Sequence, residues 1–250
     1  MQIDATRMIS EPDFDRAYDT HVLGRMFVEN HDYYRQSRQR FREGFRRIEA
    51  LGLPAGTTAM DIGGGITGVL LAKLLDFDVT VADVVETTRG DIEEQGLSFA
   101  LIDLFRDGPP PVEDLDLIVL QEVIEHIPQP PYLVFNRIAA MLAPGGRLFL
   151  TTPNGHRFRN LIYMMLGREI LDIYRYPEDG KGLGHQHEYT LKQLIWQAGH
   201  ADFVIEMAEY YRDGWRGATP GARLARLATA PADLIPHFRN SIAMMLRRPV

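Results

Sequence analysis

Cysteine is absent from this chain of 250 residues. The protein therefore forms no disulfide, has no thiolate nucleophile and cannot build a cysteine-ligated zinc site. This absence fits a reducing compartment, and we expect a cytoplasmic protein. The polar N-terminus lacks the pattern of a signal peptide. No run approaches the roughly 20 apolar residues of a membrane-spanning helix, so we expect no membrane span.

Basic residues are also in short supply. Lysine and arginine number 27 against 34 aspartates and glutamates, which gives a net charge of −7. That sign opposes binding to a phosphate backbone, and we expect no nucleic-acid partner. Apolar residues make up 45% of the chain and charged residues 24%, which is typical of a globular protein. The length suits one large domain with insertions.

A glycine cluster follows a short apolar run near residue 60. Residues 58–68 read TAMDIGGGITG, and an apolar helical run at 69–75 comes next. This order predicts a buried strand, a tight turn and a helix. Gly63, Gly64 and Gly65 leave the backbone open to a ligand and allow positive φ. The first amides of the helix lack partners within it and attract an anionic group.

Strand-like and helix-like segments alternate along the rest of the chain. Further strands are predicted at 78–82, 98–102, 115–120, 147–152, 201–208 and 241–248. The alternation implies an α/β fold, here a Rossmann-like, doubly wound, mostly parallel sheet of seven strands. We divide the chain into an N-terminal helical cap at 1–57 and a sheet domain at 58–250. Insertions are expected at 153–189, on the substrate side, and at 212–237.

Acidic residues end two of the predicted strands. Asp61 lies two residues before Gly63, where a carboxylate suits a ligand with an ammonium group and repels a pyrophosphate. Asp83 ends the second strand, about 20 residues beyond the glycines. In nucleoside-binding α/β folds an acid at this place accepts hydrogen bonds from ribose hydroxyls. The alternative role for Asp83 is that of a helix N-cap or of a turn aspartate.

Three stretches resemble motifs of class I S-adenosylmethionine (SAM) dependent methyltransferases. They are TAMDIGGGITG at 58–68, QEVIEHIP at 121–128 and LAPGGRLFLTTPN at 142–154, and the resemblance covers roughly residues 50–210. The chain departs from the family at Thr67, where a third alternate glycine is common. The resemblance implies SAM as the cofactor, S-adenosylhomocysteine as the product and an antiparallel last strand.

The resemblance also implies a set of cofactor-binding residues. Asp103 would face the adenine amino group, and the backbone near Gln121 and Glu122 would pass the methionine end. The full set is Asp61, Gly63, Gly64, Gly65, Asp83, Val84, Asp103, Leu104, Gln121 and Glu122. Glu122, Glu125 and His126 echo a Glu-x-x-Glu-His arrangement that can hold a divalent ion in ubiquinone-pathway O-methyltransferases. We expect no metal here, with these acids orienting neighbouring loops.

Three histidines are candidates for the base from which a hydroxyl acceptor benefits. Histidine titrates near neutral pH and is the side chain best suited to this role. His185 and His187 close the substrate-side insertion and are preferred over His126, which follows the fourth strand. Each of the three has an alternative role as a structural hydrogen-bonding residue.

The predicted function is transfer of a methyl group from SAM to a small-molecule acceptor, most simply a hydroxyl of a natural product or sugar. N-methylation stays open. A NAD-dependent oxidoreductase shares the Gly-x-Gly-x-x-Gly spacing, but Asp61 and Asp103 argue against it. A non-catalytic SAM-binding partner protein is a further alternative. The apolar side chains near 159–166 suit a hydrophobic substrate, core packing or a homodimer contact.

Overall fold

One sheet runs through the centre of the molecule. The computed structural model describes residues 8–23, 25, 31–104, 112–171, 184–213 and 230–250. Within them seven strands form a sheet in the order β3-β2-β1-β4-β5-β7-β6. The strands are β1 (Thr58–Ile62), β2 (Asp78–Asp83), β3 (Ser98–Leu101), β4 (Leu115–Gln121), β5 (Leu142–Pro153), β6 (Val204–Tyr211) and β7 (Ser241–Arg247).

All strands of the sheet run in the same direction except β7, the last strand in the sequence. β7 runs antiparallel to both β5 and β6, whereas β1 to β5 pair in parallel. The predicted mostly parallel, doubly wound sheet with an antiparallel last strand is confirmed. The chain reverses its direction of travel across the sheet between β1 and β4. In α/β folds, ligands bind outside the carboxyl ends of the strands at such a reversal.

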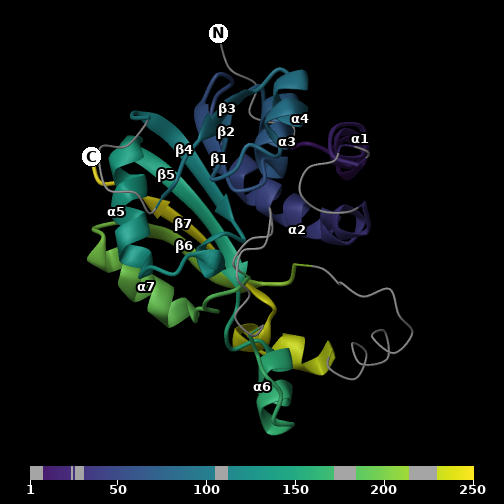
Figure 1. Cartoon of the computed structure of the whole chain (residues 1–250), viewed down its shortest axis with the longest axis vertical. Coiled ribbons are helices and arrows are strands. Elements are labelled where there is room, and N and C mark those ends of the chain that lie inside the picture. The colour runs from purple at the N-terminus through teal and green to yellow at the C-terminus, as the bar shows by residue number, and fades with distance from the viewer. Residues whose placement is uncertain (1–7, 24, 26–30, 105–111, 172–183, 214–229) are drawn as a thin grey trace.

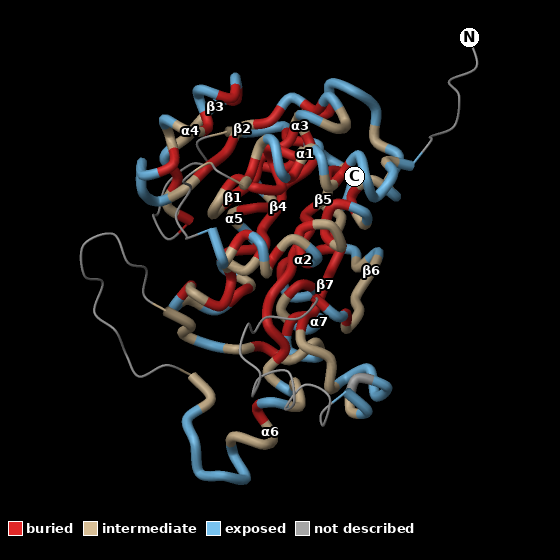
Figure 2. Tube along the Cα trace, turned by 90° about the vertical axis from the view of Figure 1, so that its right-hand side faces the viewer, coloured by how far each residue is buried: buried red, intermediate tan, exposed pale blue. Residues whose placement is uncertain are grey.

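Helices cover both faces of the sheet (Figure 1). One face carries α1 (Glu11–His21), α2 (His31–Glu49), α3 (Ile66–Leu75) and α4 (Arg89–Glu94), and the other carries α5 (Pro131–Met141) and α7 (Leu191–His200). Each face has its own apolar core. Along β5, Phe149 belongs to the first core whereas Leu148 and Leu150 belong to the second, as the two-residue period of a strand requires. Figure 2 shows this buried centre.

The first helix begins earlier than the sequence pattern predicts. That pattern indicates a loose polar start through residue 15, with helices from residue 16. In the structure α1 begins at Glu11, because the Ser10 side chain caps the Asp13 amide and Pro12 fixes φ in the first turn. This capping signal, together with the acidic first turn of Glu11 and Asp13, starts the helix within a polar stretch.

Arginines on one stripe of α2 face α1. Arg38 Nη1 lies 3.3 Å from Asp15 Oδ1, and Arg38 also pairs with Asp19. Arg42 pairs with Glu11. Exposed and partly exposed ion pairs each contribute at most about 1 kcal/mol, so their main effect is to fix how the two helices align. The side chains of Arg38 and Arg42 therefore form their ion pairs within the N-terminal helices.

The insertion after β5 projects from the lower end of the molecule in Figure 1. It contains α6 (Phe158–Met165), where the sequence predicts a helix at 159–166. Residues 172–183 and 214–229, parts of the two expected insertions, lie outside the described residues. Within the described ranges there are also three short 3-10 helices: η1 (Ile124–His126), η2 (Ala230–Leu234) and η3 (Pro236–Phe238). Among the described residues, no helix combines the length and apolarity needed to cross a membrane.

Candidate active site

The glycine turn lies at the carboxyl end of β1, where the order of the sheet reverses. Gly63, Gly64 and Gly65 have backbone φ angles of 85°, 115° and 79°. Residues other than glycine rarely adopt these values. A Cβ on Gly63 would lie 2.5 Å from Val123 Cγ2, and one on Gly65 would lie 2.8 Å from Val81 Cγ1. A Cβ on Gly64 would meet nothing within 4 Å. The backbone at Gly64 is therefore open to a ligand.

Asp61, near the end of β1, holds this turn by a hydrogen bond to the backbone of the helix that follows. Its Oδ2 accepts the Gly68 backbone N–H at 2.7 Å, and a Cβ on Gly68 would lie 2.8 Å from the Asp61 Cβ. Burial raises the pKa of Asp61 to about 7. The predicted contact between this carboxylate and a ligand ammonium stays a prediction, since its described partners are backbone amides. Thr67, the departure from the family pattern, donates its hydroxyl to Gln121 Oε1.

Asp83 closes a second turn beside the glycines. Its Oδ1 accepts the backbone N–H groups of Val84 at 2.6 Å and Val85 at 3.3 Å. Burial raises the pKa of Asp83, and backbone amides, including that of Gly64, oppose the rise. The N-cap of the following helix is Thr88, so Asp83 has no N-cap role, but its bonds to Val84 and Val85 are those of the alternative turn aspartate. The ribose role stays a prediction.

The remaining predicted nucleoside contacts differ in exposure. Val84 is 56% exposed and available to a ligand, whereas Leu104 is only 6% exposed and belongs to the core on the α5 side. Ile102 donates its N–H to the Asp83 carbonyl at 2.9 Å. This bond places Asp103, the next residue, at the same edge of the sheet as Asp83. The two predicted nucleoside acids therefore lie on neighbouring strand ends.

Glu122 occupies a strained position at the end of β4. Its backbone φ angle is 57°. A positive φ is uncommon for residues other than glycine and often marks a functional site. Thr151 Oγ1 donates to Glu122 Oε1 at 3.1 Å, and Arg40 Nη1 lies 3.1 Å from Glu122 Oε2. Arg40 comes from α2, is 2% exposed and also lies 3.8 Å from Asp213. No motif in the sequence predicts a site role for Arg40 or Asp213.

Glu125 is buried next to this pair. Thr152 Oγ1 donates to Glu125 Oε2 at 2.9 Å, and Oε1 has no hydrogen-bond partner among the described residues. Burial, followed by the charge of Glu122, raises the pKa of Glu125 well above its usual range. Both effects favour the protonated form of this carboxyl group more than in an exposed glutamate.

The structure places His126 and His185 together and His187 apart from them. The rings of His126 and His185 meet edge to face with centroids 4.8 Å apart. His126 Nδ1 lies 2.9 Å from the Gly184 carbonyl, and its pKa is lowered by burial and by His185. His187 is exposed and contacts Tyr189 instead, with centroids 4.5 Å apart. Only two of the three predicted candidates therefore lie together.

One ligand atom each from Glu125, His126 and His185 lies within 4.8 Å of the other two. Two imidazoles and a carboxylate are donors that a transition metal accepts. The predicted ligand set contained Glu122 in place of His185, but Glu122 pairs with Arg40. The expectation that activity needs no metal stays a prediction.

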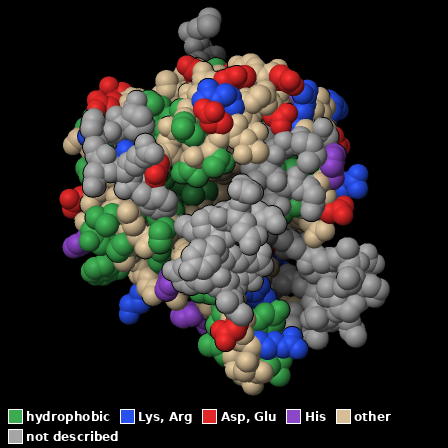
Figure 3. Space-filling model, viewed as in Figure 1, with side chains coloured by type: hydrophobic (Ala, Val, Ile, Leu, Met, Phe, Trp, Pro, Cys, Tyr) green, Lys and Arg blue, Asp and Glu red, His purple; other side chains and the backbone are tan. Residues whose placement is uncertain are grey.

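The apolar residues at the end of α6 are on the surface. Met164 is 57% exposed, Met165 78% and Leu166 63%. Figure 3 shows hydrophobic side chains next to basic ones on the lower projection of the molecule. Core packing, one of the three roles considered for this stretch, is therefore wrong for these residues. A substrate contact and a homodimer contact stay predictions.

The reversed sheet order, the open glycine turn and the acids on neighbouring strand ends define a nucleoside-binding α/β protein. A model of the methyltransferase domain family matches residues 34–207, and the chain belongs to that family. The resemblance to class I SAM-dependent methyltransferases is thereby confirmed.

Curated relatives carry the same family signal at low identity. A protein of Coxiella burnetii (strain Dugway 5J108-111) named ubiquinone biosynthesis O-methyltransferase is 28% identical over 127 residues, 46% of this chain and 51% of that protein. A protein of the same name from Bordetella avium (strain 197N) is 29% identical over 154 residues, 58% of this chain and 60% of that protein. The matched segment thus spans about half the length of the first relative.

Solved structures share the fold. Magnesium protoporphyrin IX methyltransferase from Synechocystis PCC 6803 gives a TM-score of 0.57 at 16% identity, covering 95% of both chains. The 1,6-didemethyltoxoflavin-N1-methyltransferase of Burkholderia thailandensis gives 0.55 at 17% identity, covering 99% of this chain and 94% of that one. At these identities the likeness concerns the fold alone.

Proposed function

We propose that this protein transfers the methyl group of SAM to a hydroxyl oxygen of a small molecule, with His185 as the base. The observation that carries the proposal is the placement of His185. Its Nδ1 lies 3.4 Å from a Glu188 carboxylate oxygen, and its ring lies against His126 and near Glu125. An imidazole held at one nitrogen by a carboxylate is arranged to accept a proton at the other.

The glycine turn and its neighbours fit the nucleoside. The backbone at Gly64 is open, Asp83 lies next to it, and Val84 is exposed. SAM, when bound, supplies a methyl group that needs no further activation, because its sulfonium leaves as a neutral thioether. The protein's own task is to hold the acceptor oxygen in line and to take its proton at His185 Nε2.

The acceptor class is argued from the relatives and the insertion. The curated relatives are named O-methyltransferases, which favours oxygen over nitrogen. We propose a natural-product or sugar hydroxyl; N-methylation is the alternative, and a non-catalytic SAM-binding protein is the other. The exposed apolar end of α6 supports an acceptor with a hydrophobic part. A cytoplasmic location and a homodimer stay predictions.

The test uses purified protein, SAM and a panel of phenols, catechols and sugars, with S-adenosylhomocysteine measured by mass spectrometry. We expect His185→Ala to bind S-adenosylhomocysteine normally and to lose about 10²–10⁴-fold in turnover. His187→Ala is the matched control, since that histidine is exposed and apart from the group. Full activity in His185→Ala, or loss confined to His187→Ala, would reject the assignment. EDTA treatment of wild type tests the expectation of no metal.

A further inference from the structure

Glu188 joins the two ends of the substrate-side insertion. Its side chain is 4% exposed although it lies in a connecting segment. A Cβ on Gly155 would lie 2.5 Å from the Glu188 carbonyl, and the Gly155 N–H donates to the Tyr189 carbonyl at 2.9 Å. The start of the insertion therefore packs directly on its end, and Glu188 is enclosed between them.

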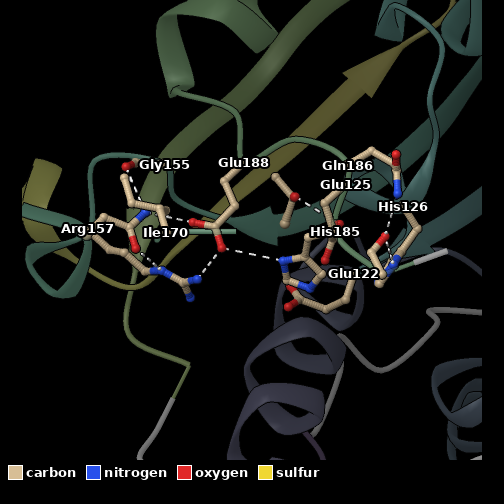
Figure 4. A network of polar contacts seen from close by, with 12 residues as sticks. Glu122, Glu125, His126, Gly155, Arg157, Ile170, His185, Gln186 and Glu188 are labelled. Atoms are coloured by element: carbon tan, nitrogen blue, oxygen red, sulfur yellow. Dashed lines mark hydrogen bonds and ion pairs between the residues drawn. The ribbon is translucent and has the colours of Figure 1, made fainter. Parts of the chain in front are cut away.

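The carboxylate of Glu188 is shared between the insertion and the candidate base (Figure 4). Asn160 Nδ2 donates to Oε2 at 2.7 Å. The Arg157 guanidinium donates a hydrogen bond to Oε1, and His185 Nδ1 lies 3.4 Å from the same oxygen. Arg159 Nη2 lies 3.7 Å from the same oxygen. Three side chains from α6 and its N-cap, and His185 from the end of the insertion, thus converge on one buried carboxylate.

The protonation of this group fixes the direction of its hydrogen bond to His185. Burial acts to raise the pKa of Glu188, but the His185 hydrogen bond, the Arg157 charge and the Asn160 hydrogen bond outweigh burial and lower it. An ionised carboxylate only accepts hydrogen bonds. His185 Nδ1 must therefore carry the proton that is shared with Glu188. In the neutral ring, Nε2 then carries the lone pair.

We propose that Glu188 is a positioning residue that fixes the tautomer and ring orientation of His185, so that Nε2 is the atom presented to the acceptor hydroxyl. This inference rests on the proposed function, because it assigns a partner to the base named there. It also ties the base to helix α6, since Arg157 and Asn160 bind the same carboxylate.

Other charged groups also act on His185 and must be kept constant in the test. These are Glu122, which directly follows β4, and Glu125 and His126, which both lie on η1. From α6 and its N-cap they are Arg159 and Arg157, which reach His185 through Glu188. Among the described residues, the hydrogen-bond partner of the His185 ring is Glu188.

The experiment compares Glu188→Gln with Arg157→Gln in two backgrounds, wild type and His185→Gln. Each protein is first checked by thermal melting and by S-adenosylhomocysteine binding. Glu188→Gln should lower kcat by about 10–100-fold with little change in KM for SAM, as for other carboxylates that orient an imidazole. In the His185→Gln background the same change should have almost no effect. Glu169→Gln, an exposed acid of the insertion, is the matched control for charge.

Several outcomes overturn the inference. If Glu188→Gln lowered kcat equally in both backgrounds, Glu188 would only hold the insertion together. The same conclusion would follow if Glu188→Gln lowered kcat no more than Arg157→Gln does. Wild-type kcat in Glu188→Gln together with an inactive His185→Ala would reject Glu188 while leaving the proposed function standing. A silent His185→Ala would instead reject the proposed function.

A spectroscopic readout covers the case in which Glu188→Gln does not fold. Nitrogen-15 shifts of the His185 ring in the wild-type protein report which nitrogen carries the proton. We expect the Nδ1–H tautomer in wild type and in the milder Glu188→Asp variant. The Nε2–H tautomer in wild type would overturn the inference without any activity measurement.

Discussion

The buried carboxyl of Asp61 makes the stability of this protein depend on pH in a particular direction. Burial raises its pKa from 3.8 to about 7. Between these values the folded protein keeps a proton that the unfolded chain has released. The unfolded state then binds fewer protons, so stability falls as the pH rises through this range. The full difference corresponds to roughly 4 kcal/mol, at about 1.4 kcal/mol per pH unit.

Asp61→Asn removes the titration and keeps an oxygen that can accept the Gly68 N–H. We expect the variant to gain stability relative to wild type as the pH rises from 4 to 7.5, by up to roughly 4 kcal/mol. Urea unfolding at a series of pH values measures this difference. Asp78→Asn, which changes an exposed acid, is the control. Parallel stability curves for wild type and Asp61→Asn would refute the reasoning.

Three further predictions concern the ligand and the helices around it. Asp83→Ala should leave the fold intact and weaken S-adenosylhomocysteine binding about 10–150-fold by calorimetry, since a hydrogen bond to a charged group contributes about 1.5–3 kcal/mol; unchanged affinity would remove the ribose role. Gly44→Ala places a Cβ 2.4 Å from Gln121 Nε2 and should cost about 1–3 kcal/mol in urea unfolding, whereas Gly199→Ala, which meets open space, should not destabilise. Arg40→Met leaves its acidic partners buried without a counter-charge, so we expect a loss of about 3–5 kcal/mol; an unchanged melting temperature would contradict this.

Local signals account for the parts of the fold that the sequence predicts well. Thr190 and Gln193 form a capping box at the start of α7, and such a pair can be read from the sequence because both partners lie within one helical turn. The three glycines of the β1 turn likewise act within a few residues. Strand bounds were less accurate: the predicted strand at 147–152 begins earlier in the structure, where β5 starts at Leu142.

Contacts between distant segments explain what the sequence could not predict. Arg40 lies on an arginine-rich helix, where an arginine ordinarily indicates a solvated surface, yet it is buried against Glu122. Glu188 and Arg157 are 31 positions apart, and no periodicity joins them. Such pairs depend on how the insertion folds back on itself.

The histidines show the same limit at short range. His185 and His187 are two residues apart and looked equivalent in the sequence. The amides of Gln186 and His187 both bind the Glu125 carbonyl, at 2.7 and 3.2 Å, so the chain bends between the two histidines. That bend leaves His185 against His126 and His187 on the surface.

The central claim is that the turn at the end of β1 binds the nucleoside of SAM. The most direct test is isothermal titration of the wild-type protein with S-adenosylhomocysteine and, separately, with NADH. We predict saturable binding of one S-adenosylhomocysteine per chain and no heat of binding from NADH. Tight binding of NADH without any binding of S-adenosylhomocysteine would contradict the account.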